Sequence, residues 1–173
     1  MRRADDGVLG GEPFFRVLRE QHPDVDLVIL PPVDAPQPDL PLAPAEDVAT
    51  TVRAARSALD GLLEAVGHPE TDARHEAWRF EDSAFVRTFI VRASLRGLPD
   101  DEAIPLLRRI GDTLLARGWD ARAVVDRPAE ILASDGRHLL DVEVVAGSID
   151  LRLESMSLAA APETIDAVTE ALR

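Results

Sequence analysis

The chain has 173 residues, 46% of them hydrophobic, and carries a formal net charge of −13. This length suits one ordinary globular domain with an appendage, and two large domains would not fit. The negative charge argues against nucleic acid and anionic membranes as partners, because both require a cationic surface. Since the chain has no cysteine, disulfides, thiolate catalysis and cysteine-ligated zinc are excluded.

All basic residues other than histidine are arginine, and lysine, asparagine and tyrosine are absent. Because the missing residue types have mainly AT-rich codons, this pattern indicates a GC-rich bacterial genome. Arg2 and Arg3 precede no apolar stretch typical of an export signal. No segment approaches the roughly 18 to 20 apolar residues of a membrane span. We therefore expect a soluble cytoplasmic protein.

The N-terminal part of the chain divides into two short segments. Residues 1–11 are rich in glycine and charge and are predicted to be disordered. Residues 12–30 are predicted to form a helix over 12–21, which Pro23 stops, and a strand over 27–30. Such a small unit cannot bury its own apolar side chains. We expect it to dock on the body of the chain, on a second copy as a homodimer, or on a partner protein, through Phe14, Phe15, Val17, Leu18, Leu27, Val28, Ile29 and Leu30.

Residues 31–44 form a proline-rich spacer, in which six of fourteen residues are proline. Proline fixes φ and removes an N–H donor, so the spacer is predicted to run extended and to enter neither a helix nor a central strand. The spacer separates the docking segment from residues 45–173, which are long enough to form their own core.

Residues 45–173 are predicted to form an α+β domain, with an antiparallel sheet of about five to six strands and helices packed on one side. Helices are expected at residues 46–66, at 100–117 and from about residue 162 to the C-terminus. In the second helix, Pro105 predicts either a short 3₁₀ turn before a start near Ile104 or a kink. Alternating apolar residues predict strands at 75–80, 84–96, 121–126, 129–134, 137–146 and 149–158.

No motif for catalysis, metal binding or a nucleotide is evident. His22, Asp24 and Asp26 are a compact set of potential ligands, but three side chains around one proline-containing turn converge poorly, and no second cluster completes a site. The glycines at residues 7–11 follow no strand, as a phosphate-binding loop would require. We therefore predict no cofactor and no metal. His68 and His138 are expected at the surface.

Arg87, Arg92 and Arg96 belong to the predicted strand 84–96. Arg87 interrupts its apolar face, which indicates the end of the strand or a bulge. The three arginines could hold an anionic substrate, and this possibility defines the alternative hypothesis, a small enzyme or ligand-binding domain with a cleft between the helices and the sheet. Because they alternate along one solvated strand, ordinary surface charge is the favoured explanation.

Residues 115–158 contain Gly118-Trp119, Asp135-Gly136, a strand over 139–145, Gly147 and Leu153-Glu154-Ser155. In this order they resemble the soluble α+β domains of small actinobacterial lipoproteins and secretion-associated accessory proteins. The resemblance implies a similar fold and an accessory, chaperone-like role beside a specialised, type VII-like secretion system. We expect a non-catalytic protein-binding module.

Overall fold

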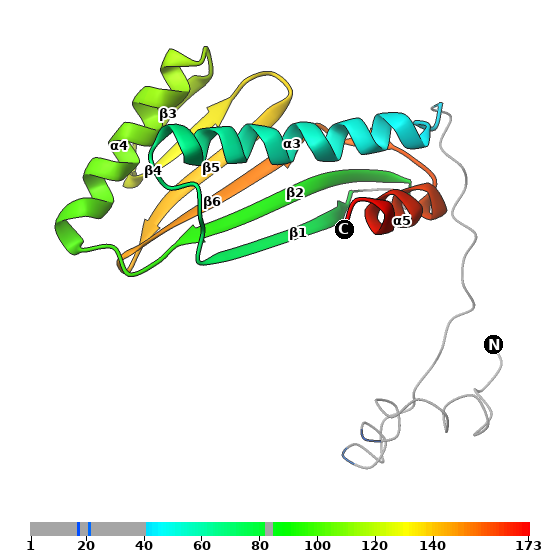
Figure 1. Cartoon of the computed structure of the whole chain (residues 1–173), viewed down its shortest axis with the longest axis horizontal. Helices are drawn as coiled ribbons and strands as arrows, with labels where there is room; N and C mark the ends of the chain where they lie inside the picture. Colours follow the sequence, from blue (N-terminus) through cyan, green and yellow to red (C-terminus); the bar gives the residue numbers. More distant parts are fainter. Residues whose placement is uncertain (1–16, 18–20, 22–40, 82–84) are drawn as a thin grey trace. The chain divides into compact units, whose positions relative to one another are not determined.

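The computed structural model describes residues 41–81 and 85–173, together with Val17 and Gln21. The chain divides into two compact units, residues 1–36 and 37–173. In the second unit the described residues form three α-helices and seven strands, so the predicted α+β class is confirmed (Figure 1). The predicted disordered terminus, the strand at 27–30 and most of the spacer lie outside the described residues.

The helices are α3 (Ala45–Ala65), α4 (Asp100–Ala116) and α5 (Pro162–Ala171). Each lies within about two residues of its predicted range. Pro99 occupies the N-cap position of α4, so the helix begins at Asp100, and Pro105 lies within one continuous α-helix. The predicted 3₁₀ turn with a start near Ile104 is therefore wrong. Gly67 and Gly118 follow α3 and α4 with φ near +81°, a conformation that glycine adopts without a steric penalty.

All seven strands belong to one antiparallel sheet in the order β1-β2-β6-β5-β4-β3, with β7 beside β2. The single strand predicted over 149–158 is two strands, β6 and β7, and the sheet thus has more strands than the five to six expected. The bounds are β1 (Ala73–Phe80), β2 (Val86–Leu95), β3 (Asp120–Val124), β4 (Arg127–Ser134), β5 (His138–Val145), β6 (Ser148–Ser155) and β7 (Leu158–Ala159).

Within the described residues, the helices cover one face of the sheet and leave the other face open (Figure 1). Strand alternation explains this arrangement, since Ile149, Leu151 and Leu153 of β6 are buried beneath the helices while the residues between them face outward. The main core joins these side chains to apolar residues of α3, α4, β2, β4 and β5. A smaller core packs α5 against the start of α3.

Two charged or polar residues of the covered face differ from expectation. His138 is buried, not at the surface, because its parity in β5 places it beside Leu140; its ring stacks on Trp119 and its Nδ1 lies 3.0 Å from Asp135 Oδ2. Arg87 shares the covered face with Phe89 and is also buried. It is the second residue of β2 and pairs regularly with Phe80, so it marks the strand end and not a bulge.

Candidate functional site

A groove of about 210 Å³ lies between α4 and β3, at one edge of the sheet. The surface of the groove is mainly apolar, because small side chains of β3 face α4, which carries one exposed leucine. Leu115 of α4 is 55% exposed, and Ala121 and Ala123 of β3 leave space beside it. Gly111 lets α4 approach closely, since a Cβ there would lie 3.0 Å from Ile131 Cδ1.

The outer edge of β3 is the second feature of this groove. β3 ends the strand order and pairs with β4 alone among the described strands. An edge strand presents backbone N–H and C=O groups that can pair with another extended chain. The groove therefore combines backbone hydrogen-bonding capacity with an apolar recess for side chains.

Arg108 of α4 and Arg122 of β3 also line the groove. The Arg122 side chain lies on the open face of β3, in one row with Leu132 and Asp141, because Ala121 and Ala123 on either side of it face α4. Within the described ranges, neither guanidinium has an ion pair or a side-chain hydrogen bond. Asp112 is the one carboxylate among the lining residues. The two arginines at this edge of the sheet thus favour a segment that brings carboxylates.

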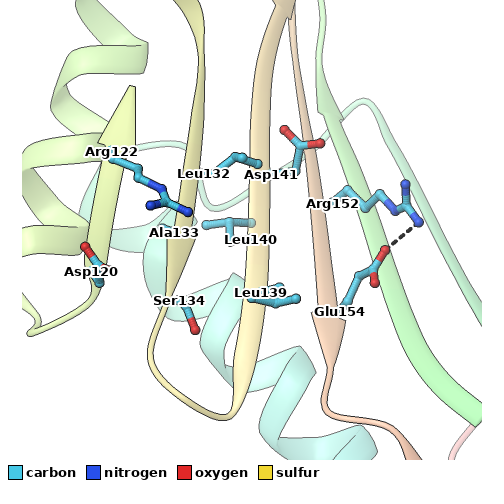
Figure 2. A pocket seen from close by; sticks show the side chains of 10 residues that line it. All are labelled: Asp120, Arg122, Leu132, Ala133, Ser134, Leu139, Leu140, Asp141, Arg152 and Glu154. Carbon is cyan, nitrogen blue, oxygen red and sulfur yellow. Dashed lines mark ion pairs between the residues drawn. The ribbon is translucent and has the colours of Figure 1, made fainter. Parts of the chain in front are cut away.

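A separate hollow of about 290 Å³ lies on the open face of the sheet, across β3 to β6 (Figure 2). Leu132 and Leu139 supply its apolar side chains, and Asp120, Arg122 and Asp141 lie around them (Figure 2). A further hollow of about 380 Å³ shares Asp141 and Arg152 with the first and extends to Arg92 of β2.

Charges on the open face are mixed and partly neutralised. Glu154 pairs with Arg152, drawn as the dashed line in Figure 2, and also with Arg79 at 2.8 Å. Arg152 Nε and Asp141 Oδ1 are buried without a hydrogen-bond partner. Arg92 and Arg96 are exposed, as expected of ordinary surface charge, whereas Arg87 lies on the covered face. The open face resembles a solvated sheet surface more than a selective anion site.

The described residues do not bring together the groups of a hydrolytic site. No hydroxyl there hydrogen-bonds a histidine ring; Ser134 Oγ, for example, donates to the backbone oxygen of His138. The pKa of Asp135 is lowered, because burial raises it but hydrogen bonds from His138 and from backbone N–H groups outweigh that effect. This arrangement stabilises the turn before β5.

Among the described residues, no group of three or more His, Cys, Asp or Glu side chains is placed to hold a metal ion. The candidate ligands His22, Asp24 and Asp26 lie outside those residues. None of the helices described is both long and apolar enough to cross a membrane.

Val17 is the one predicted docking residue that the structure describes; it is helical and 46% exposed. Phe14, Phe15, Leu18 and residues 27–30 lie outside the described residues. The groove itself was not predicted from the sequence. Leu115 gave the available signal, since it is apolar but falls outside the helical spacing of Ile110 and Leu114, which face the core.

Comparison with protein-family models, with curated proteins and with solved structures finds no match.

Proposed function

We propose that this protein is a non-catalytic, cytoplasmic protein-binding accessory module, which receives an extended segment of a partner protein along the outer edge of β3. The observation that carries the proposal is the apolar groove between α4 and that unpaired edge. Strand addition to a free edge obtains affinity from the backbone and specificity from pockets for alternate side chains. The groove beside β3 supplies such a recess on the covered side of the strand.

The chemistry of the groove defines the partner segment. Leu115 and Ile131 favour apolar side chains that point toward α4. Arg108 of α4 and Arg122 on the open face of β3 favour a segment that carries carboxylates, because charge complementarity steers association and suppresses wrong partners. The resemblance of residues 115–158 to secretion-associated domains supports an accessory, chaperone-like use of this binding.

The sequence offers one segment of the required chemistry as a probe. Residues 24–30 place Asp24 and Asp26 next to the apolar run 27–30. A fluorescent peptide of residues 23–31 is titrated into the full-length protein, and binding is followed by anisotropy. A peptide in which both aspartates are replaced by arginine serves as the charge control. We expect saturable binding of the first peptide and at least tenfold weaker binding of the second.

Two protein variants locate the binding site. Leu115→Asp places a charge in the groove, and Leu139→Asp places the same charge at an equally exposed leucine on the open face. We expect Leu115→Asp to weaken the peptide at least tenfold and Leu139→Asp to change it less than twofold. The reverse result would assign binding to the open-face hollow and defeat the proposal.

One further variant tests whether the apolar run 27–30 of the same chain competes for the groove. If the chain's own apolar run competes with the peptide, full-length protein carrying Val28→Asp binds it more tightly than the wild type. If neither the wild type nor Val28→Asp binds the peptide, strand addition at β3 is wrong.

A second candidate function rests on the unpaired Arg152 Nε and Asp141 Oδ1 of the open face. These atoms favour a small polar ligand in the hollow of Figure 2, in place of the predicted cleft between helices and sheet. A thermal-shift screen of metabolites tests this candidate: stabilisation of the wild type that disappears in Leu139→Asp would favour it.

A further inference from the structure

The outer strand β3 carries two opposite charges on one face. Asp120 and Arg122 lie two residues apart, so both side chains belong to the open face of the sheet (Figure 2). Both residues are exposed, and no ion pair within the described residues involves either of them. The edge therefore offers one carboxylate and one guanidinium that are both still able to pair.

The backbone of β3 limits which residues of that edge can pair regularly with another chain. Among the described strands β3 pairs with β4 alone, and the register between them shifts between Ala123 and Val124. An irregularity of this kind twists an edge strand and interrupts its pairing. Regular pairing along the outer edge is therefore confined to residues 120–123.

This short edge is complementary in charge to a second copy of itself. Two copies related by a two-fold axis perpendicular to the sheet pair their β3 strands antiparallel, and residues directly opposite each other then point to the same face. An axis at Ala121 places Asp120 of each copy opposite Arg122 of the other, which forms two pairs of opposite charge. An axis at Arg122 opposes two guanidinium groups, and an axis at Asp120 opposes two carboxylates. An axis at Ala123 would carry the pairing past the register shift.

The covered side of the edge fits the same arrangement. The axis at Ala121 places two alanines opposite each other on that side, so no bulky side chain separates the strands. Leu115 is 55% exposed in the groove beside Ala121, and pairing brings this groove up to the groove of the second copy. The arrangement thus covers backbone groups and apolar surface that one copy leaves in solvent.

We propose that two copies of this chain join through their β3 edges in the register centred on Ala121 and form one continuous antiparallel sheet. The dimer covers the edge at which we place a partner segment, and in this respect the inference rests on the proposed function: the partner segment displaces the second copy. The contact is short, and interfaces below about 1,200 Å² are typical of transient association. The dimer is therefore expected to exchange with monomers, which leaves the edge accessible to a partner.

Exchange of the two charges tests the register in the full-length protein. Asp120→Arg and Arg122→Asp each make the edge singly charged in sign, so each variant opposes like charges to itself. By sedimentation equilibrium at up to roughly 500 μM protein, we expect the wild type to dimerise and each single variant to associate about tenfold more weakly or worse. Circular dichroism checks that every variant is folded.

Two recoveries make the test specific. The double variant Asp120→Arg/Arg122→Asp restores both opposite-charge pairs in a homodimer, and an equimolar mixture of the two single variants restores them in a heterodimer. Both should associate within about threefold of the wild type. Arg53→Asp, at an exposed residue of α3, is the control for the same change in net charge and should leave the association unchanged.

No peptide enters this experiment, so a failure of dimerisation and a failure of partner binding are separate results. A monomeric wild type overturns the proposal, and so does a dimer that persists in both single variants, because it forms through another surface. Loss of the dimer in both single variants without recovery in the mixture or the double variant shows the register to be wrong. Saturating peptide of residues 23–31 should dissociate the wild-type dimer, and a dimer that binds this peptide and stays intact refutes the shared edge.

Discussion

Arg56→Lys tests whether one arginine of α3 holds three elements together through the shape of its side chain. Arg56 donates from Nε to both carboxylate oxygens of Glu76 on β1, at 3.1 and 3.0 Å, and from Nη2 to Oε2 at 2.6 Å. Its Nη1 donates to the backbone oxygen of Leu172, just after α5, at 2.9 Å. Lysine keeps the charge but has one nitrogen, so it cannot make the bidentate pair and the Leu172 bond together.

The magnitude follows from what lysine loses. One arm of the charge-assisted pair and the bond to Leu172 disappear, and hydrogen bonds to charged groups contribute about 1.5 to 3 kcal/mol each when buried. Because the Arg56 and Glu76 side chains are 30% and 23% exposed, solvent screens part of this effect. We expect a loss of about 2 kcal/mol, or roughly 6 °C in Tm for a chain of this size.

Urea unfolding followed by tryptophan fluorescence measures the change, since Trp78 lies on β1 near α5 and donates to Thr169 Oγ1 at 3.1 Å. Arg53→Lys is the control, because Arg53 is an exposed residue of the same helix without an ion pair among the described residues. It should change stability by less than about 0.5 kcal/mol. If Arg56→Lys costs no more than Arg53→Lys, the reasoning about the three elements is wrong.

Two further predictions concern how the stability of the fold depends on pH and on two glycines. Burial raises the pKa of Glu76, but hydrogen bonds and charge from Arg56 and then Arg74 outweigh burial and lower the pKa below its ordinary value of 4.5. The ionised form therefore stabilises the fold above pH 4.5, and urea titrations should show that the cost of Glu76→Gln shrinks as pH falls below that value. Gly118→Ala should lower the free energy of unfolding by about 1 kcal/mol, because the φ of Gly118 is +81° and a side chain is strained there even with open space around it. Gly61→Ala inside α3 should raise the free energy of unfolding by up to about 1 kcal/mol, because alanine has the higher helix propensity. Calorimetry that shows the same sign for both substitutions would contradict this account.

Periodicity predicted the fold because each element's pattern is local. The strict alternation of β6 and the helical spacing of Val52, Leu59 and Leu62 in α3 state which side chains are buried without reference to any other element. The division between β6 and β7 was missed because no glycine or proline follows Ser155, where β6 ends. The apolar Met156 and Leu158 continue the run, although they have the opposite parity to Ile149, Leu151 and Leu153.

The groove and the environment of Arg87 could not be predicted in the same way, because each depends on two elements meeting. In the sequence, Ala121 and Ala123 are small residues that indicate no binding site. They form a recess only because α4 lies beside β3. His138 was expected at the surface from its place at a strand start, yet register places its ring against Trp119. The groove and the surroundings of Arg87 and His138 all depend on how elements pair, and a single sequence does not record that pairing.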